Sequence, residues 1–83
     1  MPKIIVEVMP KPALLDPQGK AVSQALERLG KDKFHSVRVG KRFEMFVDEP
    51  VTEEVRAEAA QLASVVFANS AVEDVVSITV AED

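Results

Sequence analysis

The sequence contains no cysteine, no tryptophan and no tyrosine, and His35 is its single histidine. Without cysteine the chain has neither a disulfide nor a thiolate metal site, and one histidine excludes a metal site built on two histidines of one chain. No serine stands in a Gly-x-Ser-x-Gly setting, and no glycine-rich loop matches a phosphate cradle. These absences predict that the chain has no catalytic residue and binds no metal or cofactor itself. We expect His35 to be a surface residue.

The sequence also has no excess of positive charge and no long apolar run. The net charge is −4 at pH 7 and the isoelectric point is about 4.9, whereas nucleic-acid binding needs a positive field. No apolar run approaches the ~20 residues of a membrane span. The N-terminal residues lead directly into a predicted strand, with no secretory leader. The sequence therefore predicts a cytoplasmic protein that binds neither nucleic acid nor membranes.

The length of 83 residues predicts a single domain, residues 1–83, with a small core. The hydrophobic fraction of 47% includes only four Phe, so Val, Ile, Leu and Ala must form that core. A domain of this size without disulfides gains stability chiefly by associating with copies of itself or with partners.

Apolar periodicity predicts strands at 3–9 and 75–80 and a helix at 17–29. A second helix begins at the N-cap Thr52 and stops near Asn69. Its predicted apolar stripe comprises Val55, Ala59, Leu62, Val66 and Phe67. The element order β-α-β-(β)-α-β predicts an α+β fold of ferredoxin-like type, an antiparallel sheet with two helices on one face. Ile5, Phe46 and Val75 are expected on the other face, and such an apolar face predicts oligomerisation.

The region 34–48 has two interpretations. Its apolar side chains keep to odd positions across Gly40. A hairpin with a three-residue loop at Gly40-Lys41-Arg42 agrees with that phase. A single long strand kinked at Gly40 agrees equally well and would project towards another subunit.

Two further features call for an explanation. Gly19 lies inside the first turn of the first helix, where glycine costs roughly 0.5–1 kcal/mol relative to alanine, so we expect something to approach the backbone closely there. Basic residues cluster in the middle of the chain, either as a solvated loop or as a docking surface for an acidic partner. They are Arg28, Lys31, Lys33, Arg38, Lys41 and Arg42. The adjacent acids Glu53-Glu54 and Glu73-Asp74 are assigned to solvation and helix-dipole matching.

Several segments resemble the PurS family, the small subunits of phosphoribosylformylglycinamidine (FGAM) synthase in de novo purine biosynthesis. The segments are Leu15-Asp16-Pro17-Gln18-Gly19-Lys20-Ala21-Val22, Ala25-Leu26, Val37-Arg38-Val39-Gly40-Lys41 with Glu44, Ala68-Asn69 and Val72-Glu73-Asp74. They cover nearly the whole chain in the family's order. One departure is Ser70, where members often have proline, and it affects only the local turn.

The resemblance implies a non-catalytic subunit of an ATP- and glutamine-dependent ligase. It would bridge a PurQ-like glutaminase and a PurL-like synthetase, form a dimer or tetramer, and support ammonia transfer, while ATP and Mg²⁺ are used by the synthetase. The candidate partner contacts are Asp16, Gln18, Gly19, Lys20, Arg38, Gly40 and Lys41. Two alternatives stay open: a regulatory domain of ferredoxin-like fold that binds a small molecule, and a free-standing enzyme.

Overall fold

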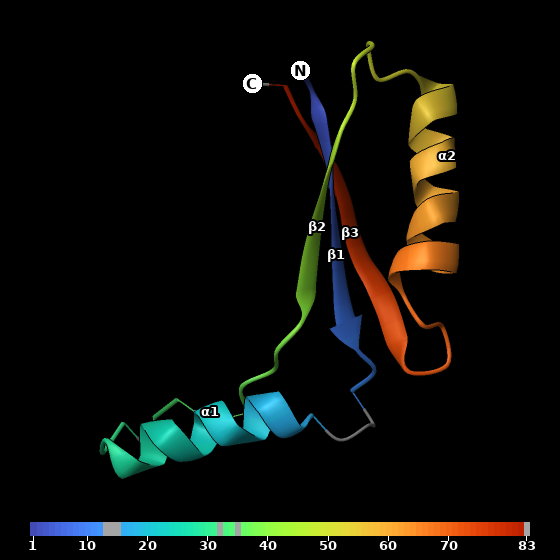
Figure 1. Cartoon of the computed structure of the whole chain (residues 1–83). Coiled ribbons are helices and arrows are strands. Elements are labelled where there is room, and N and C mark those ends of the chain that lie inside the picture. The colour runs from blue at the N-terminus through green and yellow to red at the C-terminus, as the bar shows by residue number, and fades with distance from the viewer. Residues whose placement is uncertain (13–15, 32, 35, 83) are drawn as a thin grey trace.

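The computed structural model describes residues 1–12, 16–31, 33–34 and 36–82. His35 and Leu15, on which parts of the sequence predictions rest, lie outside these residues. The elements are β1 (Lys3–Pro10), α1 (Pro17–Arg28), β2 (Lys41–Phe46), α2 (Glu53–Leu62) and β3 (Glu73–Ala81), and a π-helical turn, Ala63–Phe67, continues α2. In this part of the chain the strands form one antiparallel sheet in the order β2-β1-β3, with β1 at its centre (Figure 1).

The core lies between the central strand and α2. Ile4, Val6 and Val8 alternate along β1 and are at most 2% exposed, because their side chains all point to the face that α2 covers. The small side chains of Ala59 and Ala63 let α2 approach that face closely. Beside this contact, the rings of Phe43 and Phe67 stack at 4.4 Å between centroids and join β2 to the end of the helix.

The predicted α+β class, an antiparallel sheet with two helices, is confirmed, but the single chain places its first helix differently. Only α2 lies over the sheet, whereas α1 extends beyond the strand ends and crosses their direction (Figure 1). The radius of gyration is 16.1 Å, against about 12 Å for a compact domain of this length. The apolar stripe of α1 is consequently open to solvent, with Val22 43% and Leu29 72% exposed.

Local signals fixed the helix ends as predicted. The Asp16 side chain accepts a hydrogen bond from the Gly19 amide at the start of α1, and Thr52 Oγ1 accepts one from the Val55 amide at the start of α2. Gly30 has φ +76° and follows the end of α1, where its amide donates to the Glu27 carbonyl.

Within residues 36–46 the chain forms no hairpin at Gly40, and the paired strand begins directly after this glycine. β2 begins at Lys41 and pairs with β1. The amide of Val37 donates to Ser23 Oγ at 3.1 Å, and the amide of Val39 donates to Asp16 Oδ2 at 2.9 Å. The backbone just before Gly40 therefore bonds to α1 and its N-cap, and this excludes a hairpin at Gly40.

Val75 was predicted on the face of the sheet that α2 leaves open, but it lies on the core face. Val8 pairs with Val75 while Val6 pairs with Ile78, so a bulge in β3 brings Val75 to the core face. Val76 is turned out instead and is 56% exposed. Ile5 and Phe46 lie on the open face as predicted. Lys3, Arg42 and Glu44 also form ion pairs there, so this face is more polar than expected.

The π-helical turn changes the predicted stripe of the second helix. A π turn contains more residues than an α turn, so side chains beyond it rotate relative to an α-helical register. Ala63 and Phe67 face the core, while Val66, predicted to be covered, is 64% exposed. Leu62, the last residue of α2 before the turn, was also predicted to be covered and is 40% exposed. The end of this helix thus presents apolar side chains to solvent.

Candidate functional site

The motif segments of the sequence converge at one corner of the molecule, where β1 ends and β3 begins. Residues 16–20 start α1, residues 37–41 lead into β2, and residues 69–74 lead into β3. Hydrogen bonds and ion pairs connect all three segments, so the corner is a junction of distant parts of the chain.

The Asp16 carboxylate holds the first two segments together. Its Oδ1 accepts from the Gly19 amide at 3.0 Å, and its Oδ2 accepts from the Val39 amide at 2.9 Å and from Arg38 Nε at 3.1 Å. The side chain is only 11% exposed. The Gly19 amide, the Val39 amide and the Arg38 guanidinium together lower the pKa of Asp16, because each of them stabilises the ionised form.

Arg38 extends this contact to the end of β1. Its Nη2 donates to the carbonyl oxygens of Pro10 at 3.1 Å and Lys11 at 3.2 Å. One guanidinium therefore connects the end of the central strand, the N-cap of α1 and the segment before β2. We call this arrangement the Asp16–Arg38 junction.

Two glycines permit the close packing of the junction. A Cβ atom on Gly19 would lie well inside contact distance of the Val37 carbonyl oxygen and 2.8 Å from Asp16 Oδ2. A Cβ atom on Gly40 would overlap the Met9 sulfur. The close approach that the sequence predicts at Gly19 is thus made by the chain's own backbone.

Ion pairs attach β3 to the same corner. Lys41 Nζ lies 3.0 Å from Glu73 Oε2, and Lys11 Nζ lies 2.6 Å from Asp74 Oδ1. The Asn69 amide donates to Glu73 Oε1 at 2.8 Å and, with Lys41, lowers the pKa of Glu73. Sequence reasoning assigned Glu73-Asp74 to solvation and missed these pairs. The available signal was the family motif, which contains both acids and Lys41.

A hollow of about 200 Å³ opens beside the junction. Four of the seven predicted contact residues line it: Asp16, Gln18, Gly40 and Lys41. Gly19 is buried and Arg38 is half-buried at the junction next to it, while Lys20 is exposed on α1. The structure thus gathers these residues around one corner, where Gln18, Lys20 and Lys41 have the accessible side chains.

The corner offers a shaped surface with charged side chains. In residues 1–12, 16–31, 33–34 and 36–82, no three His, Cys, Asp or Glu side chains are placed to hold a metal ion. None of the helices described is both long and apolar enough to cross a membrane. What the junction does directly is fix the start of α1 relative to the sheet.

The junction predicts a pH-dependent effect of Asp16→Asn. The pKa of Asp16 is lower in the folded chain than in the unfolded one, so its contribution is complete above the ordinary value of 3.8 and is lost as the pH falls through the folded-state pKa. We expect Asp16→Asn to be less stable than the parent at pH 7, with the difference shrinking below about pH 4. Urea unfolding at several pH values measures it. Glu27→Gln, an exposed charge on the same helix, is the control, and a pH-independent difference would contradict the assignment.

Comparisons with known proteins agree with this architecture. The family model "PurS: Phosphoribosylformylglycinamidine (FGAM) synthase" matches residues 3–82. The PurS subunit of phosphoribosylformylglycinamidine synthase from Mycobacterium leprae is 42% identical over 74 residues, covering 89% of this chain and 90% of that protein.

Solved structures are similar over the full length. A crystal structure of Bacillus subtilis PurS matches with a TM-score of 0.80 at 30% identity, covering 99% of this chain and 100% of that one. Methanocaldococcus jannaschii PurS, described as one of the subunits of formylglycinamide ribonucleotide amidotransferase in the purine biosynthetic pathway, matches with a TM-score of 0.82 at 26% identity, covering 100% and 99%. The chain therefore belongs to the PurS family and is a subunit of FGAM synthase, a ligase complex of purine biosynthesis.

Proposed function

We propose that the chain is a non-catalytic bridging subunit that joins a PurQ-like glutaminase to a PurL-like synthetase in the cytoplasm. The observation that carries this proposal is the projecting helix α1, whose apolar stripe has no cover in the single chain. A small domain rarely leaves such a stripe exposed unless another protein surface covers it. The shape supports the same conclusion, because an extended molecule 48 Å long can contact two neighbours at once.

The proposed role follows from the chemistry of ammonia transfer. The glutaminase releases ammonia from glutamine, and the synthetase uses ATP and Mg²⁺ to activate the amide oxygen of formylglycinamide ribonucleotide. Ammonia then displaces the phosphate. Ammonia that escapes into water is diluted and protonated, so the two sites need a closed route between them. A bridging subunit closes that route by binding both enzymes and carries out no bond chemistry itself.

The corner and α1 divide this role between them. Gln18, Lys20 and Lys41 have accessible side chains and are the proposed direct contacts with a larger subunit. Asp16, Gly19, Arg38 and Gly40 act through the junction, since they hold α1 at a fixed angle to the sheet. Self-association into a dimer or tetramer covers the remaining apolar surface of α1.

The test is reconstitution from separately purified subunits. The synthetase and glutaminase are mixed with and without this chain, and turnover is measured with glutamine and then with ammonium chloride as the nitrogen source. We expect the chain to raise glutamine-dependent turnover at least about tenfold and to change ammonia-dependent turnover by less than about twofold, because ammonia in solution needs no closed route. Size exclusion should show all three proteins in one peak.

The alternatives give different results. A regulatory domain would change both activities equally and would melt at a higher temperature with its ligand alone. A free-standing enzyme would turn over substrate without added subunits. The bridging proposal fails if the three proteins do not co-elute and glutamine-dependent turnover is unchanged.

A further inference from the structure

Met9 lies near the end of the central strand and packs its thioether directly on the backbone of Gly40. A Cβ atom at Gly40 would overlap the Met9 sulfur and crowd the Val8 carbonyl oxygen, so only glycine leaves room for this contact. The Val8 side chain points to the core, and Met9, the next residue of β1, therefore faces the side of the sheet that α2 leaves open. The sulfur thus fills the space between β1 and the segment that leads into β2.

The contact is accessible from solvent. A hollow of about 260 Å³ opens on the same face, and Met9 and Gly40 line it together with Val76, Lys41 and Arg42. Val76 is 56% exposed at its edge, and Met9 itself is half-buried. A molecule as small and polar as hydrogen peroxide can therefore reach the sulfur, while the packing on the glycine holds the thioether in place.

The Asp16–Arg38 junction adjoins this contact on both segments that meet there. Pro10, the next residue of β1, accepts a hydrogen bond from Arg38 Nη2 at 3.1 Å. On the other segment, the Val39 amide donates to Asp16 Oδ2 at 2.9 Å, one residue before the glycine. A displacement at the Met9 sulfur therefore acts on the hydrogen bonds that fix the start of α1.

We propose that Met9 is an oxidation site, at which hydrogen peroxide loosens the Asp16–Arg38 junction. The thioether sulfur attacks one peroxide oxygen, and the O–O bond breaks as the S–O bond forms. The second oxygen leaves as hydroxide, takes the proton of the transferred oxygen and becomes water. The sulfur is thereby oxidised and the peroxide reduced, and the product is methionine sulfoxide, which is polar and larger than the thioether.

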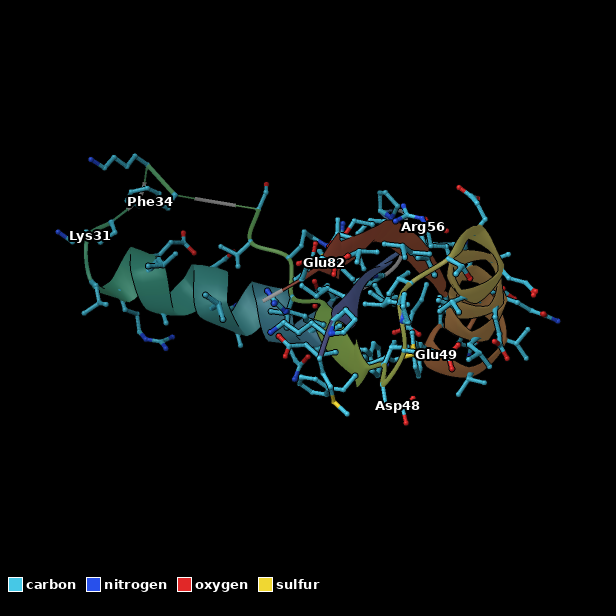
Figure 2. The ribbon with its side chains drawn as sticks, turned by 90° about the horizontal axis from the view of Figure 1, so that it is seen from above. Lys31, Phe34, Asp48, Glu49, Arg56 and Glu82 are labelled. Atoms are coloured by element: carbon cyan, nitrogen blue, oxygen red, sulfur yellow. The ribbon has the colours of Figure 1, made fainter. Side chains whose placement is uncertain are left out.

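The added oxygen has no room against the backbone of Gly40. Either the segment before β2 moves away from β1, or the side chain turns out of the contact and leaves it empty, and both changes weaken the packing beside the junction. Figure 2 shows α1 extending away from the sheet, with Lys31 beyond its far end, so a small change of angle at the junction displaces this end the most. Methionine sulfoxide reductases restore the thioether, which makes the change reversible.

The test treats the isolated chain with hydrogen peroxide and follows the gain of one oxygen atom at each methionine by peptide mass spectrometry. We expect Met9 to react within about tenfold of the rate of N-acetylmethionine amide, a freely accessible thioether. Hydrogen exchange of the Val39 amide and of the α1 amides should then accelerate by about tenfold, and a mixture of both methionine sulfoxide reductases should restore the original rates. No partner subunit is present, so the result is independent of the bridging role.

The other methionines and two substitutions supply the controls. Met45 lines a hollow between β2 and α2, on the opposite face of the sheet, and Met1 is terminal and 70% exposed. Met9→Leu removes the sulfur at similar volume, so the variant should fold and its exchange should not respond to peroxide. Met45→Leu should respond as the parent does. Met9→Gln, which places a polar group of similar length on the glycine, should accelerate exchange in α1 without peroxide.

Three results would overturn the proposal. Slower oxidation of Met9 than the tenfold limit would show that peroxide does not reach the sulfur. Complete oxidation of Met9 with unchanged exchange in α1 would show that the contact does not support the junction. A peroxide effect that persists in Met9→Leu would assign it to another residue.

Discussion

Gly19→Ala is expected to destabilise the packing of α1 on the segment before β2 by about 1 to 2 kcal/mol. Alanine is the better helix former by roughly 0.5–1 kcal/mol, and in an open helix the change would stabilise the chain. Here the added methyl group would overlap the Val37 carbonyl oxygen and crowd Asp16 Oδ2. Overpacking of this kind costs about 1–3 kcal/mol, and a backbone oxygen cannot move aside as the end of a flexible side chain can. The steric cost therefore exceeds the gain in helix propensity.

Hydrogen exchange of the α1 amides and urea unfolding measure this effect. Exchange in α1 should accelerate by about tenfold, which corresponds to about 1.4 kcal/mol, while the sheet amides change less. Lys20→Ala is the matched control, because the side chain is exposed on the same turn and should change stability by less than about 0.5 kcal/mol. A more stable Gly19→Ala chain would show that the Val37 segment does not approach the helix this closely in solution.

Gly19→Ala should also affect assembly, because the junction sets the angle of α1 relative to the sheet. If α1 is held at a fixed angle by the Asp16–Arg38 junction, loosening the junction weakens every contact that α1 makes with another protein. A loss of assembly in Gly19→Ala would therefore be accompanied by faster exchange in α1. The sequence correctly predicted a close approach at this glycine, but the approaching group could be identified only from the fold.

The features predicted well were those that depend on neighbouring residues. Asp16-Pro17 and Thr52 start helices and Gly30 ends one, because each acts on backbone groups within a few positions along the chain. The positions of the first and last strands followed from alternating side chains. These local preferences were sufficient for the α+β class and for most of the boundaries.

The features predicted poorly depend on groups far apart in the sequence. The direction of α1 is held by contacts between Asp16 and Arg38, which are 22 positions apart. The bulge that turns Val75 inwards and Val76 outwards shifts the alternation inside a strand whose pattern looked regular. The π-helical turn shifts the helical register at Val66, which is exposed instead of covered. No residue type signals either shift reliably, since both are stabilised by how the element packs.

Val6→Ala is expected to have the largest effect on stability, lowering the free energy of unfolding by about 2–3 kcal/mol. Val6 is fully buried at the middle of the central strand, between Phe43 and Ile78 on its two neighbours. The change removes two methyl groups from the core, at about 0.8 kcal/mol each, and leaves a cavity that the rigid sheet fills only in part. Total stability for a domain of this length is about 4–12 kcal/mol, so the loss is a large fraction of it.

Val76→Ala is the matched control, because it makes the same chemical change at an exposed position on the adjacent strand and should cost less than about 0.5 kcal/mol. Equal losses in the two variants would show that Val76 is as buried as Val6, which contradicts the bulge in β3.

The Val6→Ala variant also connects stability to assembly. Partners that bind only the folded chain add about 2.7 kcal/mol of stability at a hundred times their dissociation constant, which is enough to offset the Val6→Ala loss. Val6→Ala should therefore melt well below the parent when isolated and approach it when the synthetase and glutaminase are present in excess.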